Sequence, residues 1–184
     1  MHMMGIADPQ QAVALPALED EEMAGRSTAR LLITASVQGV AETLARRIHG
    51  ASLRAGLPFV RTFARELPIE PGMLRNTCSE LLDAAAGGSM LLSDVEEMPA
   101  TVQGVLVELL AELEVARAPS AAVRLIAGTT VSLLDRIAAG TFSDRLFYRL
   151  NAIHLVVPNG RSEMLPHPLP KRISPNDMSM SNSP

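Results

Sequence analysis

The chain has few aromatic residues and almost no lysine. Aromatic residues make up 3% of its 184 residues and there is no Trp, which argues against a platform of rings that stacks single-stranded nucleic-acid bases. Of the 16 basic residues one is Lys171 and the remaining 15 are Arg. Because Lys171 lies close to the end of the sequence, a mechanism that needs a lysine inside the folded part is excluded.

Cysteine, positive net charge and long apolar runs are also scarce or absent. Cys78 is the only cysteine, so no internal disulfide can form, as is typical of proteins in a reducing compartment. The formal net charge of -4 argues against direct binding to nucleic-acid phosphates. No apolar run approaches the roughly 18 residues of a membrane span, and the first residues lack the basic and then apolar order of a signal peptide. We therefore expect a cytoplasmic protein that contacts neither nucleic acid nor membranes directly.

Composition divides the chain into three parts. Residues 1–29 carry an acidic cluster and little periodicity, and are expected to form an N-terminal arm with at most one short helix. Residues 159–184 are rich in Pro and Ser and are expected to form a disordered tail, because such a segment buries too little apolar area to offset its ordering entropy. Residues 30–158 are expected to form one α/β domain.

Short apolar runs alternate with helical patterns in residues 30–158, an order typical of a parallel sheet with helical crossovers. The expected strands, mostly continuous apolar runs as in strands covered on both faces, are residues 31–34, 58–62, 89–93, 122–127 and 153–157. The expected helices are residues 40–51, 74–85, 102–113, 132–139 and 143–151. These elements predict an α/β fold of three layers around a five-stranded parallel sheet.

Several segments, in order, resemble the AAA+ domain of bacterial enhancer-binding proteins, the ATPases that activate RNA polymerase holding sigma-54. Residues 140–158 (GTFSDRLFYRLNAIHLVVP) look like the end of that domain. Residues 87–99 (GGSMLLSDVEEMP) resemble its GGTLFLDEIGDMP, and residues 124–130 (RLIAGTT) resemble its sensor strand RIIAATN. Residues 32–49 resemble its first strand, P-loop and following helix, LITGESGTGKELVARAIH. The resemblance covers about residues 31–166 and implies a P-loop NTPase fold.

The chain departs from this family where the chemistry takes place. A P-loop needs glycines whose backbone N–H groups surround the phosphates, then a Lys for the β and γ phosphates and a hydroxyl for magnesium. The aligned stretch is ASVQGVAE, in which Ala41 stands at the Lys position and Gly39 is the single glycine. Arg46 and Arg47 follow more than a turn later and are not expected to replace the lysine. The resemblance therefore implies a degenerate phosphate site.

The metal-binding and sensor positions differ as well. The family's Asp-Glu pair aligns with Ser93 and Asp94, so the metal-side acid is missing and Asp94 stands at the position of the catalytic Glu. A carboxylate without its metal partner is more often a helix cap or an ion-pair partner than a working acid. Thr130 replaces the sensor Asn. The resemblance thus implies a vestigial pocket of Gly39, Asp94 and Thr130 with no catalytic residue, no metal site and no cofactor beyond weak binding of ATP and magnesium.

Compared with the family that it resembles, the chain also lacks other parts of a working activator. The GAFTGA loop that touches sigma-54 is absent between residues 59 and 87, and a Pro-rich segment follows where the family has a helical lid. The family's two arginines that reach the nucleotide of a neighbouring subunit align with Ser143 and Arg149, and Arg145 lies two residues after the first of these positions. Arg145 and Arg149 are therefore the expected partner face.

The leading hypothesis is a catalytically inactive AAA+-like module, without a helical lid, that regulates transcription or serves as a scaffold through protein contacts. Its expected partner is an intact AAA+ sigma-54 activator, and its oligomeric state stays open. The alternative is a weak ATP-binding protein or residual ATPase of the same family. A decayed paralogue that folds without a present role is the third possibility.

Overall fold

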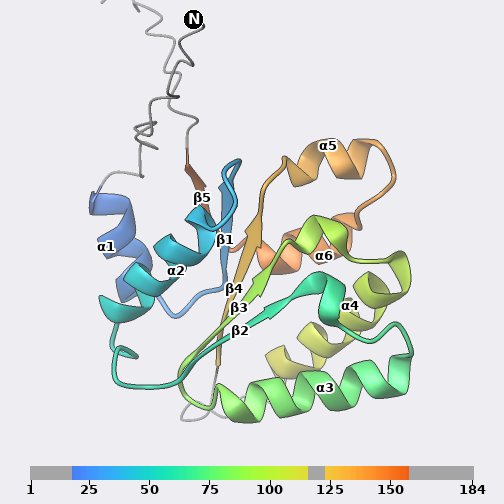
Figure 1. The fold of residues 1–184 in the computed structure, drawn as a ribbon, viewed down its shortest axis with the longest axis horizontal. Coiled ribbons are helices and arrows are strands. Elements are labelled where there is room, and N and C mark those ends of the chain that lie inside the picture. Colours follow the sequence, from blue (N-terminus) through green and yellow to red (C-terminus); the bar gives the residue numbers. More distant parts are fainter. Residues whose placement is uncertain (1–17, 116–122, 158–184) are drawn as a thin grey trace, which may run out of the picture.

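The computed structural model describes residues 18–115 and 123–157, which form an α/β domain around one parallel sheet (Figure 1). The strands are β1 (Leu31–Ala35), β2 (Phe59–Phe63), β3 (Ser89–Ser93), β4 (Arg124–Thr129) and β5 (Ile153–Val157). Their order in the sheet is β2-β3-β4-β1-β5, and every pair of neighbours is parallel. The expected five-stranded parallel sheet and α/β class are confirmed.

Helices cover both faces of this sheet. The α-helices are α1 (Leu18–Arg26), α2 (Val40–Gly50), α3 (Pro71–Ala84), α4 (Ala100–Val115), α5 (Leu133–Ala138) and α6 (Asp144–Leu150), and two short 3-10 helices are η1 (Ala64–Glu66) and η2 (Val95–Glu97). Figure 1 shows α1 and α2 on one side of the sheet and α3, α4 and α6 on the other. No helix in the described ranges is long and apolar enough to cross a bilayer.

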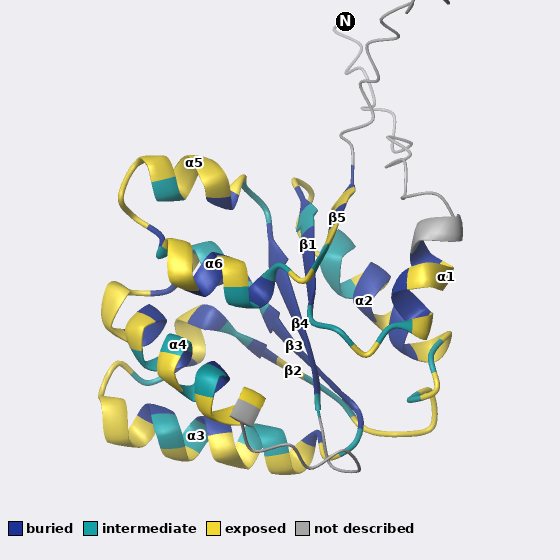
Figure 2. Cartoon of the chain, turned by 180° about the vertical axis from the view of Figure 1, so that it is seen from behind, coloured by how far each residue is buried: buried dark blue, intermediate teal, exposed yellow. Residues whose placement is uncertain are grey.

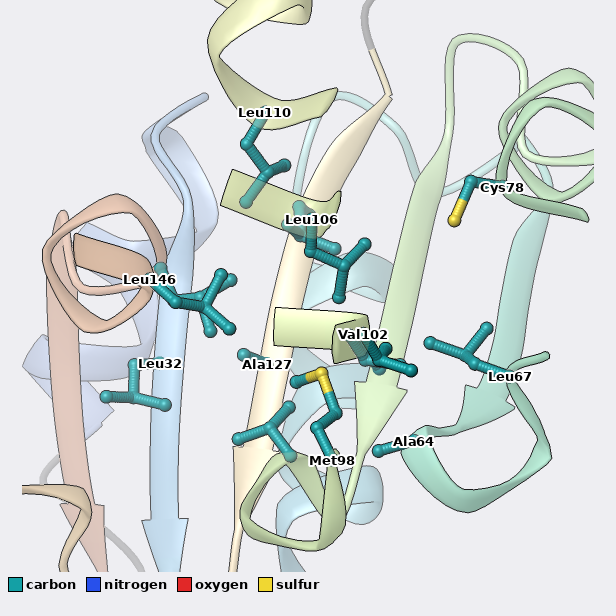
Figure 3. Packing of buried hydrophobic residues seen from close by; sticks show 14 of the residues in the cluster. Leu32, Ala64, Leu67, Cys78, Met98, Val102, Leu106, Leu110, Ala127 and Leu146 are labelled. Carbon is teal, nitrogen blue, oxygen red and sulfur yellow. The ribbon is translucent and has the colours of Figure 1, made fainter. Parts of the chain in front are cut away.

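The alternation of side chains along the central strands builds two separate cores. Leu32 of β1 packs into the cluster under α3, α4 and α6, whereas its neighbours Leu31 and Ile33 pack into the cluster under α1 and α2. All three side chains are fully buried, and each such leucine or isoleucine contributes roughly 1.5–3 kcal/mol of hydrophobic stabilisation. Figure 2 shows the buried colour concentrated along the strands, and Figure 3 shows the larger cluster in detail. Two-sided burial explains why these strands read as continuous apolar runs.

Helix α1 lies inside the segment expected to be an arm, and it packs on the domain. Its Ala24 is fully buried in the cluster with α2. The buried Arg124, at the start of β4, donates a hydrogen bond from Nη2 to the Ala24 carbonyl oxygen at 2.7 Å and one from Nε to the Ala29 carbonyl oxygen at 3.1 Å. The packed domain therefore begins before residue 30. The expected tail, residues 159–184, lies outside the described residues, as does the segment where a lid would follow.

The end of α2 is fixed to the start of β3 by a buried polar contact. His49 Nδ1 and Ser89 Oγ share a hydrogen bond at 3.0 Å, and the His49 ring packs edge-on against Phe59 with centroids 5.2 Å apart. Burial lowers the pKa of His49, so the ring is held neutral beside several arginines. The last turn of α2 is thus joined to the first residue of β3 and to the first residue of β2.

Gly88 allows β2 and β3 to approach each other closely at their first residues. A Cβ atom added to Gly88 would lie 1.9 Å from the Pro58 carbonyl oxygen and 2.8 Å from its carbon. The same Pro58 oxygen accepts a hydrogen bond from the Ser89 backbone N–H at 3.0 Å, and the Gly88 oxygen accepts one from Arg124 N–H at 3.0 Å. A side chain at residue 88 would therefore force apart backbone that sets the register of three strands.

Replacement of Gly88 by alanine is expected to destabilise the domain by at least about 2–3 kcal/mol, because the clash is with backbone that cannot rotate away. The matched control is Gly104→Ala in α4. Gly104 is solvent-exposed and an added Cβ would meet nothing within 4 Å, so this change should stabilise the helix by up to about 1 kcal/mol. Urea unfolding of both variants measures the difference, and equal midpoints would contradict the account of Gly88.

Candidate functional site

A cavity of about 110 Å³ lies at the carboxyl edge of the sheet. Ala35 ends β1, Ser93 ends β3 and Thr129 ends β4, and all three line this cavity. The first turn of α2 supplies a further wall. Ligands of open parallel sheets bind at this edge, because loops from several strands converge there.

The three residues expected at the vestigial pocket come together in this cavity. Gly39 precedes α2 and has a φ of 81°, a left-handed conformation that favours glycine, while Asp94 follows β3 and Thr130 follows β4. The parallel sheet thus brings three loops that are distant in sequence to one place. What the cavity can bind depends on the partners that its lining residues already contact.

The start of α2 offers a methyl group where the resemblance places a lysine. Ala41 lines the cavity, and a Cβ added to Gly128 would lie 3.2 Å from the Ala41 Cβ, so the helix approaches β4 closely. The side chain of Ala41 has neither a charge nor a hydrogen-bonding group to offer a phosphate, in contrast to the lysine of the resemblance. The chain's single lysine, Lys171, lies outside the described residues.

The next residue, Glu42, brings a carboxylate into the cavity lining and holds two arginines. Glu42 Oε1 accepts hydrogen bonds from Arg46 Nε at 3.0 Å and Arg46 Nη2 at 2.8 Å, and Glu42 Oε2 accepts one from Arg61 Nη1. Burial acts to raise the pKa of Glu42, but the hydrogen bonds and charges of Arg46 and Arg61 outweigh it and leave this pKa below its ordinary value. Glu42 is therefore ionised at neutral pH.

Two arginines of β2 and η1 stack on the same aromatic ring at the cavity. The Arg61 guanidinium carbon lies 4.5 Å from the centre of the Phe63 ring and that of Arg65 lies 4.3 Å from it, both within the range of cation–π contacts. Arg61 and Phe63 line the cavity. Sequence analysis missed this group, which we call the arginine ladder (Arg61, Phe63 and Arg65). A sequence signal exists for Arg61 and Phe63, whose spacing of two places both side chains on one face of β2. Arg65 lies in η1, where the alternation of a strand does not apply.

Asp94 is held in an unfavourable setting for a charged group. Its backbone is left-handed, with a φ of 55° and a ψ of 47°, and its residue is 8% exposed. Burial raises the pKa of Asp94, the charges of Glu96 and Glu97 raise it further, and Arg65 opposes them through an ion pair at 3.3 Å. Asp94 is thus the ion-pair partner of the ladder.

Thr130 contacts a different acid. Its backbone N–H donates to Glu96 Oε1 at 2.9 Å, and its hydroxyl donates to the same oxygen at 2.6 Å. The other carboxylate oxygen of Glu96 is buried and has no hydrogen-bond partner among the described residues. Thr130 and Asp94 therefore line one cavity with different partners. No group of three or more His, Cys, Asp or Glu side chains within the described ranges could hold a metal ion.

The expected partner-face residues lie away from this cavity, on α6. Arg145 and Arg149 line a second, open depression together with Tyr148 and Val107. Arg149 Nη1 donates to Glu114 Oε2 at 2.6 Å, whereas Arg145 is exposed and pairs with no acid among the described residues. Arg149 is thus engaged within its own chain.

Comparison with known proteins identifies the domain. Residues 72–156 match the model of the family described as the sigma-54 interaction domain. The regulatory protein AtoC of Escherichia coli is 33% identical over 150 residues, which are 72% of this chain and 32% of AtoC. The nitrogen assimilation regulatory protein NtrX of Azorhizobium caulinodans is 32% identical over 149 residues, 73% of this chain and 33% of that protein. This is a sigma-54 interaction domain.

Solved structures agree with the assignment. The crystal structure of NtrX from Brucella abortus in complex with ATP superposes with a TM-score of 0.64 at 28% identity, covering 81% of this chain and 39% of that one. The P-loop NTPase domain of a sigma-54 activator from E. coli, with a TM-score of 0.56 and 18% identity over 75% of this chain and 97% of that one, supports the fold alone. The chain spans about a third of the length of these curated relatives.

The setting of Asp94 predicts that Asp94→Asn stabilises the sigma-54 interaction domain. Asparagine keeps an oxygen for Arg65, tolerates the left-handed backbone and removes a charge that burial and two neighbouring acids disfavour. At neutral pH we expect the melting temperature to rise by about 1–3 °C, a gain below about 1 kcal/mol.

This gain should depend on pH with a definite sign. The pKa of Asp94 is raised in the folded state, so the wild-type carboxylate takes up a proton as pH falls through that pKa, and its disadvantage against asparagine disappears. Thermal melts of both proteins between about pH 8 and about pH 4 test this. A variant less stable than wild type at neutral pH would show instead that the Arg65 ion pair outweighs burial.

Proposed function

We propose that this sigma-54 interaction domain does not hydrolyse ATP and that it regulates transcription, or serves as a scaffold, through protein contacts in the cytoplasm. The observation that carries the proposal is that the methyl group of Ala41 lines the cavity where the resemblance places the phosphate-binding lysine. Phosphoryl transfer depends on positioned cations around the transferred group. Among the described residues that line this cavity, the single cation is Arg61, and Glu42 already binds it.

The arginines near the cavity do not compensate, because each is already engaged by an acid. Arg61 is paired with Glu42, and Arg65 is paired with Asp94 and with Glu97, the last at 3.6 Å. By the resemblance, Ser93 stands at the position of the family's metal-side acid, and a serine hydroxyl is a poor substitute for a metal-binding carboxylate. Among the described residues that line the cavity, an entering phosphate would therefore meet no unpaired cation.

Weak binding of ATP is the second candidate function. The NtrX structure from B. abortus that resembles this chain was solved in complex with ATP. Arg61 lines the cavity and supports this alternative, since a guanidinium can form two parallel hydrogen bonds to one phosphate group. ATP bound without turnover would be compatible with a regulatory role.

The proposed partner is an intact sigma-54 interaction domain ATPase, contacted through α6. Buried Gln103 places the start of this helix, because its Oε1 accepts from the Ser143 backbone N–H at 2.7 Å and its Nε2 donates to the Met98 carbonyl oxygen at 2.9 Å. Arg145 lies in the first turn that follows, and its guanidinium pairs with no acid in the part of the chain that the structure describes. For Arg149 to reach a partner, its bond to Glu114 would first have to break.

The test combines turnover and capture. The purified chain alone should release no phosphate from ATP above the buffer control, and added to an intact sigma-54 activator ATPase it should be captured with it and lower its rate. Arg145→Ala should weaken capture by roughly tenfold, since truncating an interfacial arginine costs more than about 1 kcal/mol. Arg75→Ala on α3 removes the same charge elsewhere and should leave capture unchanged. Turnover by the chain alone, or equal effects of the two variants, would contradict the proposal.

A further inference from the structure

Strand β5 forms one edge of the sheet and carries no charge that would keep another strand away. It pairs with β1 on one side, and no strand of the described residues pairs with its other side. Its sequence, IHLVV, contains no Pro, Gly, Asp, Glu, Lys or Arg. Partial burial lowers the pKa of His154, so the strand is uncharged at neutral pH. Native proteins usually protect such an edge, because its unpaired N–H and C=O groups can pair with another strand.

The opposite edge of the sheet, β2, does carry a charged residue. Arg61 stands in the middle of that strand, where it binds Glu42 and stacks on Phe63. A charged side chain on an edge strand discourages further pairing. Of the two edges, β5 is therefore the one that is suited to a partner strand. Figure 2 shows the exposed colour on β5 beside the buried colour of β1.

One hydrogen bond shows which backbone groups of β5 point away from the sheet. The Ile153 N–H donates to the Arg30 carbonyl oxygen at 3.1 Å, on the side of β1. Because these directions alternate along a strand, the N–H and C=O groups of His154 and Val156 point to the outer edge. The side chains of His154 and Val156 are exposed on one face of the strand. The outer edge thus presents two donors, two acceptors and an exposed valine.

These groups match a second copy of the same strand. In an antiparallel pair, opposite residues that exchange two hydrogen bonds alternate with opposite residues that exchange none. When Leu155 stands opposite Leu155 of a second copy, His154 stands opposite Val156 on both sides of that central pair. Each His154–Val156 pair then exchanges two hydrogen bonds, so the arrangement uses every outward N–H and C=O group of both strands. A two-fold axis through the Leu155 pair relates the two copies.

We propose that the chain forms a symmetric homodimer by antiparallel pairing of β5 with β5 of a second copy, so that one sheet continues through both. A second copy fits better than an unrelated segment, because this register uses all the outward groups and brings no charges together. The Val156 side chain of each copy covers the His154 ring of the other and removes apolar area from water. The inference goes beyond the proposed function, and the pairing involves neither the cavity nor ATP.

Sedimentation equilibrium of the full chain over a range of concentrations tests the proposal. The wild type should change from monomer to dimer in the micromolar range, because the contact is small. Val156→Pro removes an outward N–H and keeps the bonds to β1, since an edge strand tolerates proline where the N–H faces solvent. Val156→Lys places a charge on the edge. Each change should weaken dimerisation at least about tenfold.

The matched control is Leu134→Lys. Leu134 belongs to α5 and is 58% exposed, close to the 56% of Val156, but it is part of neither sheet edge. This variant should dimerise as the wild type does. Thermal melts of all variants establish that they are folded before their masses are compared.

Disulfide trapping tests the register of the two strands. In the proposed register residues 154 and 156 of different copies are opposite, with Cα atoms about 5.5 Å apart, which is within reach of a disulfide. A mixture of His154→Cys and Val156→Cys proteins should therefore form a mixed disulfide faster than either variant forms one with itself. Equal rates would contradict this register.

Three results of sedimentation would overturn the homodimer. A wild type that stays monomeric at all concentrations would show that no second copy occupies the edge. Unchanged dimerisation in both Val156 variants, or an equal loss in Leu134→Lys, would show that the copies meet elsewhere. None of these results bears on ATP turnover, so the proposed function is tested separately.

Discussion

Burial of both faces of the central strands is the constraint on which the rest of the structure depends. β1 and β4 are covered by α1 and α2 on one side and by α4 and α6 on the other, and all six residues of β4 are buried. Parallel strands fixed in this way end at one edge, so the loops after β1, β3 and β4 must meet there. The sheet builds the cavity, and the side chains at its edge decide what the cavity can bind.

At that edge the charges are arranged in pairs within the chain. Glu42 binds two arginines, Asp94 binds a third, and Glu96 binds the backbone and hydroxyl of Thr130. A P-loop ATPase instead keeps a lysine available to phosphate and an acid available to the metal. The domain of this chain thus keeps the architecture of the sigma-54 interaction family, while the arginines at this edge are paired with acids of the same chain.

The fold could be predicted from the sequence because strands that are buried on both faces have continuous apolar runs. The expected ranges of β1, β3 and β5 agree closely with the structure. β2 begins at Phe59 and not at Pro58, since a proline cannot donate to the ladder. That Gly39, Asp94 and Thr130 line one cavity was predicted from the family resemblance. The hydrogen bonds from Arg61 to Glu42 and from Arg124 to α1 could not be predicted from the sequence, because each joins residues whose proximity depends on the complete fold.

The most direct test of the central claim is calorimetric titration of the wild-type chain with ATP and magnesium, with sedimentation of the same samples. The account predicts no saturable heat and no change in mass, since Ala41 supplies no cation and Glu42 holds the nearest one. Saturable binding accompanied by assembly into a larger particle would contradict it, and would show that the cavity still works as a nucleotide site.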